Sequence, residues 1–134
     1  MARKFALIVA TSILATSAVA ALQSAHADVK PIKLRIHNAA KINIQIFVQD
    51  FVGKKSDEQK GVVAPEKETY SQAMPDAKGK VDFFIQVRFV DEKKGSYYRC
   101  LAIQTDPKGE SELKYNVTET FGKAVGGAGV GCRP

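Results

Sequence analysis

The stretch Val81-Asp82-Phe83-Phe84-Ile85-Gln86-Val87-Arg88-Phe89-Val90 decides the fold. Its odd-numbered positions are all apolar, whereas Asp82, Gln86 and Arg88 occupy even-numbered positions. Alternation with a period of two over this length predicts a β-strand with one buried face. The charged segment 91–96 that follows predicts a turn, so we expect residues 97–104 to return as the second arm of a β-hairpin.

Shorter segments with the same alternation lie on both sides of this hairpin. They predict strands at 32–37, 42–49, 61–64, 68–72 and 113–118. The segments 53–61, 74–80 and 122–131 are polar or glycine-rich and predict loops. After residue 27 no segment has apolar residues at helical spacing, so we expect an all-β domain. Six to seven short strands indicate a small antiparallel β-sandwich, or a barrel, with the odd-numbered face of 81–90 in its core.

The N-terminal segment resembles an export signal. Arg3 and Lys4 precede an uncharged segment, 5–21, and Ala25-His26-Ala27 matches a cleavage site for signal peptidase. A transmembrane anchor is the alternative, but the apolar segment is short and rich in small residues. We therefore predict a signal peptide at 1–27, a single domain at 28–134, and a periplasmic or extracellular location.

The two cysteines, Cys100 and Cys132, both follow the predicted cleavage site. An even number of cysteines in an exported chain predicts a disulfide, which would stabilise the fold by about 3.5–4 kcal/mol through chain entropy. A metal or redox pair is the alternative, but there is no C-x-x-C spacing and no adjacent histidine.

The charges and motifs argue against several functions. The net charge is +6, but the basic residues are scattered, so we expect no nucleic-acid partner. His37 has no candidate nucleophile beside it in the sequence, and no acidic cluster has the spacing of a calcium loop. The glycines of 126–131 have no room for a helix after them, as a nucleotide-binding fingerprint requires. We therefore predict no catalytic residue, no metal and no cofactor.

Aromatic residues outside the predicted core give the main indication of function. Phe47, Phe84 and Tyr97 are expected on a face that also carries Gln86 and Arg88, a composition suited to binding. The alternative is that loops cover this face. These residues suggest an exported, non-enzymatic binding module for a protein or a glycan.

Two other functions stay open at this stage. One is a membrane-active β-protein, lipid-binding or pore-forming, which would use surface aromatics, basic residues and the apolar glycine-rich loop at a membrane surface. The other is a small periplasmic hydrolase or enzyme inhibitor. Tyr98-Arg99-Cys100 is similar to the Y-x-C of small periplasmic lysozyme inhibitors, but the Ser-Gly loop of those inhibitors has no counterpart, so we assign no family.

Overall fold

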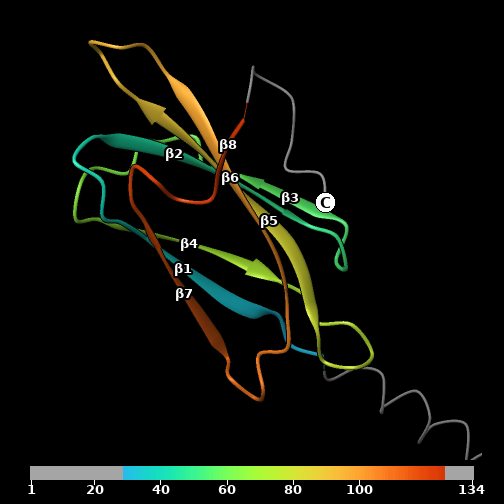
Figure 1. Cartoon of the computed structure of the whole chain (residues 1–134). Coiled ribbons are helices and arrows are strands. Elements are labelled where there is room, and N and C mark those ends of the chain that lie inside the picture. The colour runs from blue at the N-terminus through green and yellow to red at the C-terminus, as the bar shows by residue number, and fades with distance from the viewer. Residues whose placement is uncertain (1–28, 126–134) are drawn as a thin grey trace, which may run out of the picture.

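The computed structural model describes residues 29–125, which form eight strands in two sheets (Figure 1). The three-stranded sheet has the order β4-β1-β7 and the five-stranded sheet the order β3-β2-β5-β6-β8. The strands are β1 (Ile32–Asn38), β2 (Asn43–Asp50), β3 (Lys55–Glu58), β4 (Glu68–Ala73), β5 (Val81–Val90), β6 (Tyr97–Thr105), β7 (Glu112–Val117) and β8 (Lys123–Val125). The predicted signal peptide and Cys132 lie outside the described residues.

The hydrophobic core lies between the two sheets, which confirms an all-β, sandwich-like architecture. The odd-numbered residues of β5 are all buried, as their alternation predicts, and they share one cluster with Leu34 and Ile36 of β1. Phe83 of the five-stranded sheet meets Tyr115 of the three-stranded sheet edge to face, with ring centroids 6.0 Å apart. The inner faces of both sheets are therefore assigned by direct contact.

The prediction of a purely antiparallel sandwich is wrong in one pair, because β1 and β7 run parallel. The segment 53–61 is also not only a loop, since β3 lies within it and pairs with the end of β2. Ladder hydrogen bonds need only the backbone, and a short charged strand at a sheet edge discourages pairing with other chains. Conversely, the strand expected at 61–64 is reduced to one bridge between Val63 and Ile44.

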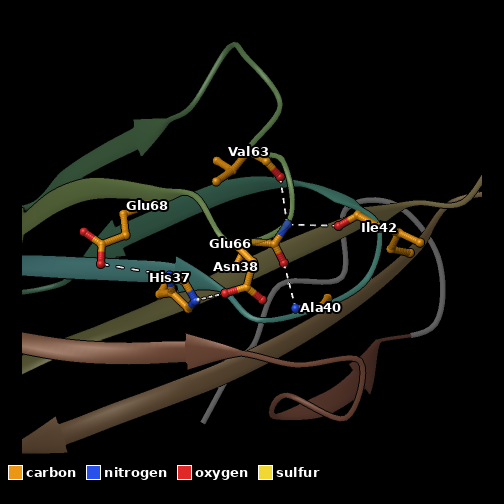
Figure 2. Close-up of polar contacts among 7 residues, drawn as sticks. All are labelled: His37, Asn38, Ala40, Ile42, Val63, Glu66 and Glu68. Carbon is orange, nitrogen blue, oxygen red and sulfur yellow. Dashed lines mark hydrogen bonds and ion pairs between the residues drawn. The ribbon is translucent and has the colours of Figure 1, made fainter.

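A buried asparagine forms the corner where the chain passes from β1 to β2. Asn38 is fully buried, and its amide nitrogen donates to the carbonyls of Ile42, at 2.9 Å, and Val63, at 2.8 Å (Figure 2). Its amide oxygen accepts from the backbone N–H of Ala40, at 2.9 Å. Because these bonds satisfy three backbone groups at a sharp turn, Asn38 has a structural role.

Candidate functional site

The outer face of the three-stranded sheet carries charged side chains that pair with one another. Arg35 of β1 lies 2.7 Å from a carboxylate oxygen of Glu112 on β7 and 3.8 Å from one of Glu68 on β4. The side chains of the three residues are each between 25 and 37% exposed, so the pairs are partly shielded from water. We call this surface the charge-paired face, and it comprises Lys33, Arg35, His37, Glu68, Tyr70 and Glu112.

The histidine that sequence analysis singled out lies on the charge-paired face. His37 Nε2 is 3.4 Å from Glu66, and Nδ1 is 3.9 Å from Glu68 (Figure 2). Glu66 is held in place by its backbone N–H, which donates to the carbonyl of Asn38 at 2.8 Å, and its φ is +66°. Within residues 29–125 the side chain of His37 contacts carboxylates and no hydroxyl or thiol nucleophile. The approach of Glu66 and Glu68 to His37 could not be predicted from the sequence, because it depends on the register of β1 with β4.

Tyr70 completes the charge-paired face. Its hydroxyl donates to Glu68 at 3.0 Å, and the Lys33 ammonium lies 4.1 Å from the centre of its ring. The hydrogen bond to Glu68 raises the pKa of Tyr70 above its ordinary value, with burial and the charge of Glu68 adding to the effect. Each of the six residues of the charge-paired face therefore contacts another residue of the protein, whereas the side chains of Gln72, Lys114 and Asn116, which the register places on the same side, make no hydrogen bond or ion pair within residues 29–125.

The outer face of the five-stranded sheet carries three phenylalanines in contact. Phe84 of β5 packs against Phe47 of β2, with centroids 5.8 Å apart, and against Phe51, with centroids 5.7 Å apart. Phe84 is only 5% exposed, whereas Phe51 is 37% exposed. The expectation that Phe84 lies opposite the core is correct, but other side chains cover it. Sequence analysis missed Phe51, because it follows β2 in a turn where no alternation assigns a face.

Side-chain amides surround these rings. By register, Gln45 lies opposite Arg88, Phe47 opposite Gln86, and Gln49 opposite Phe84. Arg88 donates to the amide oxygen of Gln45 at 3.0 Å. The Gln49 and Gln86 side chains are half-buried and make no hydrogen bond within residues 29–125. We call this surface the amide–aromatic face, and it comprises Gln45, Phe47, Gln49, Phe51, Phe84, Gln86 and Arg88.

Tyr97 does not lie with the other predicted binding residues. Its ring stacks on the core residue Phe89, with centroids 4.8 Å apart and planes 8° from parallel. Tyr97 pairs with Phe89 across β5 and β6, and paired residues point to the same side of a sheet. Its expected place on the outer face is therefore corrected. Phe47, Phe84, Gln86 and Arg88 are brought together.

Cys100 is buried and pairs across the strands with Gln86, so its side chain lies on the amide–aromatic side of the sheet. Its bond to Cys132 stays a prediction, because Cys132 lies outside the described residues. In the described part of the chain, no group of three or more His, Cys, Asp or Glu side chains is placed to hold a metal ion. Within the same residues, no helix is long and apolar enough to cross a membrane.

Comparison of the chain with protein-family models, with curated proteins and with solved structures finds no match. The two outer faces are therefore the features of the molecule from which a function can be inferred.

Proposed function

We propose that the protein is an exported, non-enzymatic binding module whose ligand-binding surface is the amide–aromatic face. The main support comes from Gln49 and Gln86, which are half-buried beside phenylalanine rings. Their side-chain amides make no hydrogen bond to any other residue of the segment 29–125. Recognition surfaces typically combine packed aromatic rings with neighbouring polar groups that have no partner in the free protein. Phe84 packs against Phe47 and Phe51, and side chains whose rotamers are already restricted by packing lose less entropy when a ligand binds.

The charge-paired face is less suited to binding. A ligand for Arg35 or His37 would have to displace the carboxylates that already contact them. The same contacts disfavour hydrolysis at His37, because a general base needs a nucleophile or its water within hydrogen-bond reach.

Export and the disulfide belong to the same proposal. A bond between Cys100 and Cys132 would join the C-terminal residues to the sheet that carries the binding surface. The mass of the unreduced, exported protein should be two hydrogens below that of the reduced chain, and no thiol should react with an alkylating reagent. Two alkylated cysteines in freshly exported protein would contradict the bond.

The binding role is tested by retention of material from cell envelopes on the immobilised protein. Gln86→Ala changes the amide–aromatic face, and Gln72→Ala makes the same change on β4, on the outside of the other sheet. Both positions are at least partly exposed, so neither change should disturb the fold. We expect Gln86→Ala to lose bound material that Gln72→Ala and the unaltered protein retain. Equal retention by all three proteins would remove the amide–aromatic face as the binding surface.

A further inference from the structure

The neighbours of Phe47 form a regular pattern. Gln45 and Gln49 flank Phe47 along β2, and Gln86 lies opposite it on β5. Positions two apart along a strand are separated by about 7 Å, and neighbouring strands by about 5 Å. The half-buried ring of Phe47 therefore has amide groups on three sides, and Glu58 of β3 is its cross-strand neighbour on the fourth.

The polar groups of this surface suit a ligand that both donates and accepts hydrogen bonds. Each glutamine amide offers donors on its nitrogen and an acceptor on its oxygen, as does a sugar hydroxyl with its single O–H and lone pairs. The apolar faces of sugar rings also suit a phenyl ring with a negative face, because their C–H groups point towards it.

The charges on this side of the sheet are balanced. By register, the outward charged residues of β3, β5 and β8 are Glu58, Asp82, Arg88 and Lys123, two acidic and two basic. Arg88 is bonded to Gln45, and Asp82 accepts from Gln104 at 3.3 Å. Binding of phosphates, acidic sugars or anionic lipid would favour a cluster of cations. The surface lacks such a cluster among the described residues, so an uncharged ligand fits it best.

The position of the amides within the sheet disfavours an extended peptide. Peptides that add a strand use the backbone of a sheet edge. The amides lie on β2 and β5, and both strands are inside the sheet. β2 is paired with β3 on one side and β5 on the other, and β5 is paired with β2 and with β6. Contacts here can come only from side chains.

From these observations we infer that the ligand is an uncharged glycan chain, with one sugar ring stacked on Phe47 and its hydroxyls bonded to Gln45, Gln49 and Gln86. This inference depends on the proposed function, because it names the ligand of the same surface. Phe51 extends the apolar part of the surface next to Phe84 and gives a second sugar an apolar contact.

The test is titration of the purified protein with cello-, malto- and chito-oligosaccharides, followed by calorimetry and by NMR shifts. An acidic oligosaccharide derived from pectin is titrated in the same way, as the charged ligand against which the uncharged ones are compared. We expect at least one uncharged oligosaccharide to bind, with shifts centred on β2 and β5. Gln86→Ala and Phe47→Leu should each weaken binding about tenfold, and Gln72→Ala should leave it unchanged. Phe47→Leu keeps an apolar side chain of similar size, so a melting curve close to that of the unaltered protein will show that folding is intact.

Three results would overturn the inference. The first is that no uncharged oligosaccharide binds, and the second is that the acidic oligosaccharide binds more tightly than the uncharged ones. The third is that Gln72→Ala weakens binding as much as Gln86→Ala does. If envelope material is still retained through Gln86 while no uncharged oligosaccharide binds, the binding surface stands and a protein partner replaces the glycan. If neither is bound through this face, the proposed function itself fails.

Discussion

The two outer faces of this protein each carry an arginine among polar and aromatic residues, but they differ in the groups around it: carboxylates on the charge-paired face, and amides and phenylalanines on the amide–aromatic face. The charge-paired face places an arginine, a histidine and a tyrosine against carboxylates from neighbouring strands, with Arg35 in contact with both Glu68 and Glu112. The amide–aromatic face places an arginine beside a neutral amide and leaves Gln49 and Gln86 without bonds in the described residues. A surface whose polar groups satisfy one another gains little from a ligand. A surface whose amides face water beside an apolar ring can exchange that water for a ligand at small cost.

The largest expected difference between the faces is in stability. Phe84→Ala should lower the free energy of unfolding by about 3 kcal/mol, because it removes a buried ring that two other rings cover. Tyr70→Ala on the charge-paired face should cost less than about 1 kcal/mol, since Tyr70 is 44% exposed and loses a surface hydrogen bond and a cation–π contact. Urea denaturation of both variants measures the difference. A larger loss for Tyr70→Ala would show that the charge-paired face is the more tightly built.

Alternation alone predicts much of this comparison. The odd-numbered residues of β5 are buried as predicted, because a period of two fixes the side of a sheet. The same rule correctly places Phe47, Phe84, Gln86 and Arg88 on the opposite side. It fails for Tyr97, because the turn before β6 sets which of its faces meets the core and the sequence does not define that register.

Contacts between strands that are distant in sequence could not be predicted. The parallel pairing of β1 with β7 brings Glu112 to Arg35, and the pairing of β1 with β4 brings Glu68 to His37. Neither pairing leaves a local signal in the sequence. Phe51 was missed for a related reason, since a turn residue acquires its side only from the packing around it. The charge-paired face is therefore a result of topology, whereas most of the amide–aromatic face follows from local alternation.

The salt dependence of stability should differ between variants of Arg35 and Arg88. Arg35→Ala should lower the free energy of unfolding by about 0.5–1 kcal/mol at low ionic strength. This loss should be smaller in 1 M salt, because salt screens ion pairs that are partly exposed to water. Arg88→Ala should lower the free energy of unfolding by less, and this loss should respond little to salt, because Arg88 donates to the neutral amide of Gln45. Denaturation of both variants at two salt concentrations gives the comparison. An Arg88→Ala loss that depends more steeply on salt than that of Arg35→Ala would mean that the two faces do not differ in the way described.

The smallest effect is on a single proton. Tyr70 donates to Glu68, and this bond is the main reason that its pKa is raised. Glu68→Ala should therefore lower the pKa of Tyr70, as followed by the NMR shift of its ring during an alkaline titration. Tyr115 is the internal control, because burial between the sheets alone raises its pKa and Glu68 does not contribute to it.

Since the folded-state pKa of Tyr70 is raised, its contribution to stability is complete below the pKa of an unfolded tyrosine and is lost as the pH rises through the raised value. In Glu68→Ala that alkaline loss should become smaller. If the pKa of Tyr70 is the same in Glu68→Ala as in the unaltered protein, the Glu68 carboxylate does not govern Tyr70, and the contact between them does not persist in solution.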